Sequence, residues 1–376
     1  MKIAYVAICA VADNFGVPKK IQYQLNGWRG CGAECEFFGA APDANSPERI
    51  VEGQIFERKR GGNLWQQWQI DRAVLGKMLD AVRDWKPDLV YLRWGYHKKE
   101  CLKLAKEFPT VIEVNGDIIE TAYLKVSSER LLKRYFGLYI RATVPLLFRE
   151  ACGFVAVTHE VGRLDYLTKW RKPIGVFPNS IALQEYEALP FEDEEGKLPR
   201  LVFIGNVQAW HGLDQLVKLA RSTVGELEFD VVGCEETPEL RTENITFHGY
   251  LKREDYLKVF RKASVGIDGL AIYRKKMDEA CALKIREYAA SGLPLILASE
   301  DTAFMGIEAD WILRIGNDEG NVTDNREKIV KFAKDWRGRR NTHAEVATYV
   351  DSAEVEKRRL LFLQQVYNKN HKVKNY

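Results

Sequence analysis

The chain of 376 residues lacks several features that would place a protein in a functional class at once. No apolar run reaches the ~20 residues that a membrane-spanning helix needs, and no cleavable signal pattern follows Met1. A formal net charge of only +3 gives no reason to expect a nucleic-acid partner. The seven cysteines are scattered, and the close pair Cys31 and Cys35 has no clustered histidines, so no metal or redox site is predicted. These absences favour a cytoplasmic protein with reduced thiols and no cofactor.

A dinucleotide-binding signature is also missing. No Gly-x-Gly-x-x-Gly follows the strand-like segments 2–8 and 201–204, so a dehydrogenase is poorly supported. What is present is the composition of a folded soluble protein, with 46% hydrophobic and 29% charged residues. The length exceeds what one hydrophobic core usually serves, so two domains are expected.

Both halves of the chain alternate short apolar runs with amphipathic stretches, the pattern of parallel βαβ units. An acidic, proline-containing segment separates the halves and is interpreted as an exposed linker. A single long helix is predicted after Thr342. The predicted division is a first domain over 1–183, a linker over 184–200, a second domain over 201–345 and a C-terminal helix over 346–376. Predicted strands cover 2–8, 34–38, 88–92, 110–114 and 153–157 in the first half, and 201–204, 229–232, 245–247, 265–267, 295–298 and 311–315 in the second.

Polar chemistry is most concentrated between Met277 and Ser299. Lys284 and Glu287 are three residues apart and share a helix face, while Glu279 lies just before that helix. Gly292 suits the end of the helix, Pro294 prevents its continuation, and an apolar strand follows. A lysine beside free helical N–H groups is suited to bind phosphate, and carboxylates can hold sugar hydroxyls.

This segment resembles the signature of retaining glycosyltransferases of the GT-B fold, especially family four: two glutamates separated by seven residues, then Gly-x-Pro and a hydrophobic strand. The resemblance implies an α/β protein of two Rossmann-like parallel-sheet domains that face an interdomain cleft. It also implies that Glu279 faces the donor sugar and Glu287 the nucleotide ribose. It further suggests that the C-terminal helix returns to the first domain. The alternative is an exposed helix with an ordinary Lys–Glu pair.

The segment that follows strand 201–204 supplies a second set of candidates. Gly205 lets the backbone approach a ligand, and Gly212 opens a helix whose N-terminus can face phosphate. Family members usually carry Arg and Lys where this chain has Asn206 and His211. We expect a neighbouring diphosphate to raise the pKa of His211 so that it is protonated, with most of the positive charge supplied by Lys284, helped by Arg274 or Lys275. The alternative for His211 is a packing role.

Candidates in the first domain are fewer. Gly16 resembles the glycine loop of the family that approaches the donor, although a plain loop fits as well. Asn115 and Asp117 follow a strand and are candidates for the acceptor side or for proton handling, but Asn-Gly also makes an ordinary turn. The stretch 130–148 mixes basic and bulky apolar residues. We interpret this stretch as a helix that faces the core, or else as one that rests on an anionic membrane surface.

These observations predict a glycosyltransferase that moves a sugar from a nucleotide-diphosphate donor to a glycan, a lipid-linked glycan or a small molecule. The resemblance to retaining families implies retention of the anomeric configuration. The rival predictions are a nucleotide-sugar epimerase and a non-catalytic sugar-nucleotide or glycan-binding protein. No metal is expected, nor a nucleic-acid partner. The predicted location is cytoplasmic, with peripheral contact to the inner face of the membrane as an option. The predicted catalytic residues are Glu279, Lys284 and His211, and the predicted donor-binding residues are Gly16, Gly205, Asn206, Gly212 and Glu287.

Overall fold

The structure is a computed structural model, and it describes residues 1–12, 16–95, 98–117, 130–192 and 197–374. The chain forms two compact units. Unit 1 consists of Met1–Pro178 and Ser352–Tyr376, and unit 2 consists of Asn179–Asp351. The observed boundaries therefore lie at 178 and 351, where the sequence placed them at 183 and 345. The acidic segment from 184 onward belongs to unit 2.

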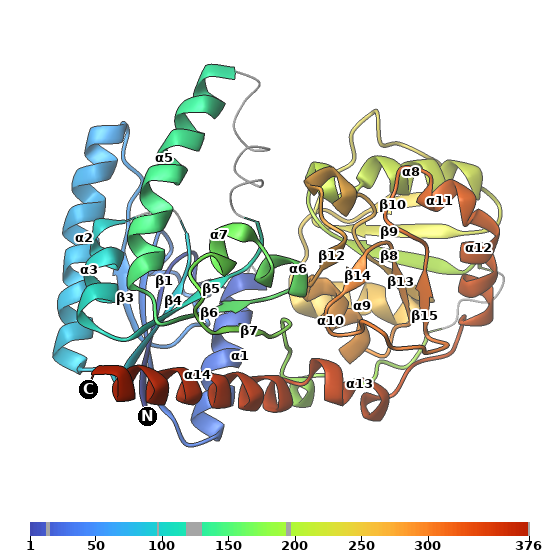
Figure 1. The fold of residues 1–376 in the computed structure, drawn as a ribbon. Helices are drawn as coiled ribbons and strands as arrows, with labels where there is room; N and C mark the ends of the chain where they lie inside the picture. The colour runs from blue at the N-terminus through green and yellow to red at the C-terminus, as the bar shows by residue number, and fades with distance from the viewer. Residues whose placement is uncertain (13–15, 96–97, 118–129, 193–196, 375–376) are drawn as a thin grey trace. The chain divides into compact units, whose positions relative to one another are not determined.

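Unit 1 is built on a seven-stranded parallel sheet with the strand order β3-β2-β1-β4-β5-β6-β7 (Figure 1). Strands predicted at 2–8 and 110–114 are found at those bounds, while the short strands β3 and β7 were not predicted. The elements are β1 (Lys2–Ile8), α1 (Gly16–Gly30), β2 (Glu34–Ala41), β3 (Gln54–Glu57), α2 (Leu64–Trp85), β4 (Leu89–Arg93), α3 (Lys99–Glu107), β5 (Thr110–Val114), α5 (Arg130–Glu150), β6 (Gly153–Ala156), α6 (His159–Gly162), α7 (Asp165–Thr168), β7 (Ile174–Val176) and α14 (Ser352–Lys374).

Unit 2 is built on a six-stranded parallel sheet with the order β10-β9-β8-β11-β13-β15, beside a two-stranded sheet of β12 and β14. Its elements are η1 (Leu183–Glu185), β8 (Arg200–Ile204), η2 (Ala209–His211), α8 (Leu213–Ser222), β9 (Glu228–Val232), β10 (Ile245–Phe247), α9 (Arg253–Lys262), β11 (Val265–Ile267), η3 (Ile272–Lys275), β12 (Glu279–Ala280), α10 (Leu283–Ala290), β13 (Leu295–Leu297), β14 (Glu300–Asp301), β15 (Ile312–Arg314), α11 (Asn321–Asp324), α12 (Arg326–Asp335) and α13 (His343–Val350).

The core of unit 1 centres on aromatic side chains beneath the sheet. Tyr5, Trp28 and Tyr91 are all fully buried, and each ring centroid lies 5.0–5.8 Å from the next. Such aromatic contacts add about 0.5–1.5 kcal/mol per pair to the burial of the rings. Helix α14 packs against α1, where the side chain of Glu356 fills the space next to Gly27. The C-terminal helix is therefore part of the core of unit 1.

The single helix predicted after Thr342 is in fact two helices. Helix α13 begins with a capping box formed by Thr342 and Glu345 and ends before Asp351, whose backbone is extended. Asp351 instead forms an isolated bridge with Ile181, and α14 begins at the next residue. The break is thus made by a pairing with a distant segment, which helical periodicity could not reveal.

Candidate functional site

The loop that leaves β8 is held tightly by two glycines. A Cβ atom on Gly205 would lie 2.9 Å from the ring of Phe203 and 3.1 Å from Nδ1 of His211, so only glycine fits there. Gly212 has a left-handed backbone with φ of 68°, and a Cβ atom on it would lie 2.9 Å from the Cβ of Leu270. Gly212 thereby starts α8 in close contact with the segment after β11. The structure confirms the strand, loop and helix that were predicted here, and the ligand roles of both glycines remain predictions.

The segment after β11 packs against the β8 loop and the start of α8, and we call the place where these segments meet the corner. The main-chain N–H of Leu270 donates to the carbonyl of His211 at 3.0 Å. Asp268, two residues earlier, is buried, and burial raises the pKa of its carboxyl despite the opposing charge of Lys284. Asp268 was not predicted, and its position after the short apolar strand 265–267 was the signal available in the sequence.

Lys284 points from the first turn of α10 to this corner. Its ammonium lies 4.0 Å from the centroid of the Phe203 ring and 3.8 Å from Oδ1 of Asp268. The distance to Asp268 exceeds that of a hydrogen bond, and among the described residues Nζ of Lys284 has no hydrogen-bond partner. The side chain is only 10% exposed, and burial lowers its pKa to about 8 although Asp268 opposes the shift.

His211 lies in η2 between the two glycines. Its Nδ1 is 2.8 Å from the carbonyl oxygen of Asn206, which can only accept, so Nδ1 carries a proton. Burial, and then the charge of Lys284, lower the pKa of His211 to about 4. In the ligand-free protein the imidazole is therefore neutral at pH 7, with Nε2 as an acceptor. Protonation of His211 beside a diphosphate stays a prediction.

The two glutamates of the motif occupy different settings. Glu279 is buried in β12, which pairs with β14, and its Oε1 accepts a hydrogen bond of 2.9 Å from the hydroxyl of Thr302. Glu279 lies just before α10, as predicted, and it belongs to this separate small sheet. Glu287 is half-buried on α10, one turn after Lys284, as the spacing predicted.

The two further basic candidates are engaged elsewhere. The guanidinium of Arg274 forms a two-pronged ion pair with Asp214, with contacts of 2.8 and 2.6 Å, and also donates to the carbonyl of Ala209. Lys275 lies over the ring of Trp210, at 5.1 Å from its centroid. Because the charge of Arg274 is already paired, Lys284 is the stronger candidate for an anion.

The three candidates in unit 1, Gly16, Asn115 and Asp117, have different surroundings. Gly16 is the exposed first residue of α1, and residues 13–15 of its predicted loop lie outside the described part of the chain. Asn115 donates to Oε2 of Glu113 at 3.0 Å and accepts from Nζ of Lys20. Asp117 is half-buried, and its charge contributes to the raised pKa of Tyr166, after burial. Asn115 therefore serves a buried network rather than an open turn.

That network surrounds Glu113, which is fully buried at the end of β5. Nζ of Lys20 and Nη1 of Arg93 each lie 3.0 Å from its carboxylate, and Gln24 donates to it at 3.1 Å. Burial alone would raise the pKa of Glu113, but Lys20 and Arg93 outweigh it and hold that pKa well below the usual range. The sequence analysis missed this network. Its only local signal was a glutamate inside the apolar strand Thr110–Val114.

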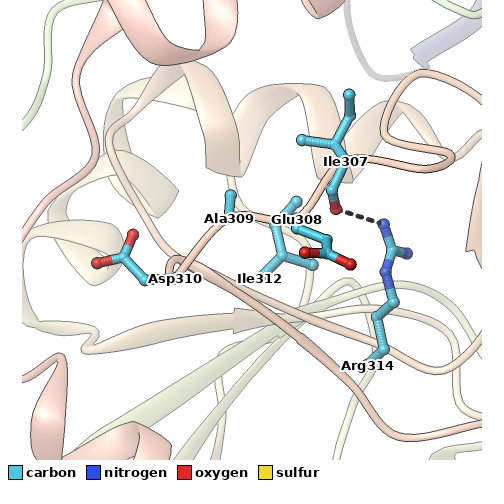
Figure 2. A pocket seen from close by; sticks show the side chains of 6 residues that line it. All are labelled: Ile307, Glu308, Ala309, Asp310, Ile312 and Arg314. Carbon is cyan, nitrogen blue, oxygen red and sulfur yellow. Dashed lines mark hydrogen bonds between the residues drawn. The ribbon is translucent and has the colours of Figure 1, made fainter.

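A shallow pocket of about 510 Å³ lies elsewhere on unit 2 (Figure 2). Its guanidinium, from Arg314, already donates to the carbonyl of Phe304 at 2.6 Å and to Glu300 at 3.2 Å. None of the predicted site residues lines this pocket, so it is not the candidate site. The lining residues are Ile307, Glu308, Ala309, Asp310, Ile312 and Arg314.

The part of the chain that the structure describes contains no group of three or more His, Cys, Asp or Glu side chains that could hold a metal ion. None of the helices described is both long and apolar enough to cross a membrane.

Comparisons with known proteins show which family and which fold this chain resembles. Residues 198–325 match the family model of glycosyl transferases group 1. A search of curated protein sequences finds no match to the chain. Solved structures do match it over nearly its whole length at low identity, so they bear on the fold alone.

Three of these structures illustrate the likeness. Sucrose-phosphate synthase from Thermosynechococcus elongatus has a TM-score of 0.71 at 13% identity, covering 98% of this chain and 99% of that one. An alpha-glucosyltransferase in complex with UDP and a mismatched 13-mer DNA has a TM-score of 0.64 at 13% identity, covering 97% and 100%. HepE from Anabaena, in complex with UDP and glucose, has a TM-score of 0.62 at 13% identity, covering 97% and 100%.

The predicted fold class, an α/β protein with two Rossmann-like domains, is confirmed. The chain has two parallel sheets flanked by helices, and it matches solved structures of this fold over nearly its whole length. The glycosyl transferase match also covers the corner that holds Gly205, His211, Gly212 and Lys284. The chain as a whole thus has the GT-B fold, and residues 198–325 match the family of glycosyl transferases group 1.

Proposed function

We propose that this glycosyltransferase transfers a sugar from a nucleoside diphosphate sugar to a carbohydrate, lipid-linked or small-molecule acceptor, with retention of the anomeric configuration. The donor diphosphate binds at the corner formed by the β8 loop, the segment after β11 and the first turn of α10. Glu279 and Glu287 orient the sugar and the ribose. Retention is proposed from the resemblance of the two-glutamate motif to retaining families.

The observation that carries this proposal is the ammonium of Lys284. A buried cation without a hydrogen bond is costly, because burial removes hydration that nothing in the free protein replaces. The aromatic face of Phe203 and the carboxylate at 3.8 Å offset only part of that cost. An anion that accepts hydrogen bonds would supply what is missing, and a diphosphate is the anion that glycosyl donors carry.

The same arrangement suits the chemistry of transfer. When the glycosidic bond to the donor breaks, negative charge develops on the departing diphosphate, and a cation already held in place lowers that barrier. The N–H groups at the start of α8 and the side chain of Asn206 add neutral donors. Several of the similar solved structures are complexes with UDP or UDP-glucose, which supports a uridine diphosphate sugar as the first donor to test.

A thermal-shift screen tests the donor. The purified protein is heated with UDP, GDP, ADP and their sugars, and one base is expected to stabilise it selectively, by about 2.7 kcal/mol at a hundredfold excess over Kd. Lys284→Met should abolish the shift, whereas Lys218→Met, which removes an exposed lysine from α8 in the same unit, should retain it. A shift that survives in Lys284→Met, or no shift with any nucleotide, would refute the proposed site.

Product analysis then separates transfer from its rivals. With the selected donor and a panel of acceptors, the proposal expects nucleotide release that depends on acceptor, and an anomeric proton signal of unchanged configuration by NMR. Conversion of the donor sugar without any acceptor would instead identify an epimerase. Binding without turnover across the panel would identify a sugar-nucleotide binding protein.

A further inference from the structure

Helix α5 of unit 1 is apolar on two faces. Gly137, Ile140, Val144, Leu147 and Phe148 are buried on one side, where the helix packs against α3. The opposite side presents Tyr135, Leu138, Tyr139 and Leu146, each between 41% and 69% exposed. The spacing of these four residues keeps them on one outward stripe. A surface helix normally places polar residues there, so core packing explains only half of this helix.

Helix α2 presents a similar feature at its first turns. Trp65 and Trp68 are 65% and 54% exposed, and the guanidinium of Arg72 lies 5.5 Å from the ring centroid of Trp68. Two tryptophans exposed one turn apart are unusual on a soluble surface, because each leaves a large apolar area in water.

The two helices bring these side chains to the same end of unit 1. Both follow strands of one parallel sheet, so both begin at the edge where the strands end. Both crossovers run in the same direction along the sheet, which places α2 and α5 on one face with α3 packed between them (Figure 1). We call the exposed residues Trp65, Trp68, Tyr135, Leu138 and Tyr139 the aromatic rim.

Charge around the aromatic rim is strongly one-sided. Between Glu57 and Asp80 the sequence has five basic residues and one acid, Asp71, and α5 again has five basic residues and one acid, Glu150. The whole chain is nearly balanced, with 56 basic and 53 acidic residues. Asp71 is moreover buried and paired with Arg58 at 2.7 Å and with Lys98. Arg60, Arg72 and Arg141 are exposed, so the charge that the described residues present beside the rim is mainly positive.

We propose that the aromatic rim binds an anionic phospholipid surface and holds the protein peripherally on it. Tryptophan and tyrosine are the side chains that favour the interface between headgroups and acyl chains, and nearby lysines and arginines are attracted to anionic lipid. A second copy of the chain would bring two positive surfaces together, which is unfavourable. The proposal is independent of the sugar donor.

Vesicle flotation tests the proposal with the full chain. The protein is expected to bind vesicles of phosphatidylcholine that contain roughly 30% phosphatidylglycerol, an anionic lipid. It should bind vesicles of phosphatidylcholine alone only weakly. Trp65→Ser with Trp68→Ser, or Leu138→Ser with Tyr139→Ser, should each reduce partitioning on the order of tenfold. Leu361→Ser is the matched control, because Leu361 is an exposed leucine on α14 of the same unit.

Charge is tested separately. Arg141→Glu should reduce binding to the anionic vesicles by about fivefold or more, and Lys218→Glu in unit 2 should not. Both residues are exposed, so both variants should fold, which their unchanged thermal denaturation would verify.

Three results would overturn the proposal: no binding of the parent to anionic vesicles, equal loss in the Leu361→Ser control, or concentration-dependent association in sedimentation that the rim substitutions abolish. The last would assign the rim to self-association. The nucleotide-induced thermal shift should be the same in the rim variants as in the parent. A failed membrane proposal is therefore distinguishable from a failed donor site.

Discussion

In each unit the ammonium of a lysine is buried near the carboxyl ends of the strands, and these two lysines, Lys20 and Lys284, differ in one respect. Burial lowers the pKa of Lys20 in unit 1 and of Lys284 in unit 2 to about 8 in both cases. Nζ of Lys20 lies 3.0 Å from Glu113 and donates to Asn115, whereas Nζ of Lys284 has no hydrogen bond among the described residues. Burial and pKa alone therefore do not distinguish a structural lysine from one that awaits a ligand.

Hydrogen bonding makes the distinction. Lys20 belongs to a network that the protein completes by itself, so that lysine has no need of an external partner. Lys284 has only an aromatic face and a carboxylate at 3.8 Å, so its ammonium is poised for an acceptor from outside. The comparison predicts that breaking the first site costs stability, while breaking the second costs binding.

The largest expected effect comes from Glu113→Gln. The substitution leaves the buried cations Lys20 and Arg93 without a countercharge, and we expect a loss of about 3–5 kcal/mol in the free energy of unfolding. Because the pKa of Glu113 is held well below its usual range, its stabilisation is present at neutral pH and is lost only as the pH falls through that low value. Chemical denaturation at pH 7 measures the loss.

The matched control is Glu107→Gln. Glu107 forms ion pairs with Arg83 at 2.6 and 2.7 Å, but both side chains are more than a third exposed, and exposed pairs contribute only about 0–1 kcal/mol. Equal losses in the two variants would show that the burial of the Glu113 network has no special weight.

The sequence revealed the second of these sites better than the first for a physical reason. Glu279, Lys284 and Glu287 lie within one short segment, where helical spacing and the Gly-x-Pro stop are readable. The first network joins residues from three separate elements, namely Lys20 of α1, Arg93 of β4 and Glu113 of β5. No local spacing marks such a meeting, and only a glutamate within an apolar strand hinted at it.

Charge states were harder to predict than positions. Protonation of His211 beside a diphosphate stays a prediction, whereas the sequence could not reveal that burial and Lys284, which is distant in the sequence, lower its pKa to about 4. The strand β3 escaped prediction because it has four residues, of which the two ends are exposed. Elements set by long-range pairing thus remained beyond what periodicity can predict.

An intermediate effect is expected from pH on nucleotide binding. With a pKa of about 8, Lys284 is mostly protonated at pH 7 and mostly neutral at pH 9, and a diphosphate binds the protonated form. Affinity for UDP, or for the nucleotide that the screen selects, should fall about tenfold over this range, because one pKa unit corresponds to a factor of ten. Isothermal titration at both pH values measures it.

The control for this dependence is Lys284→Met. That variant should bind weakly at both pH values, and its affinity should no longer decrease between pH 7 and 9. A parent protein whose affinity is flat between pH 7 and 9 would contradict the assignment of Lys284 as the anion-binding cation.

The smallest effect is expected from His211→Gln. Because the imidazole is neutral and donates from Nδ1 to the carbonyl of Asn206, glutamine can replace the same donor without removing a charge. A neutral hydrogen bond is worth about 0.5–1.5 kcal/mol, so the nucleotide affinity at pH 7.5 should change by about threefold or less. Titration of parent and variant under one condition measures this ratio. A loss of tenfold or more would mean that His211 becomes a cation when the diphosphate binds, and that Lys284 shares the anion with a second charged group.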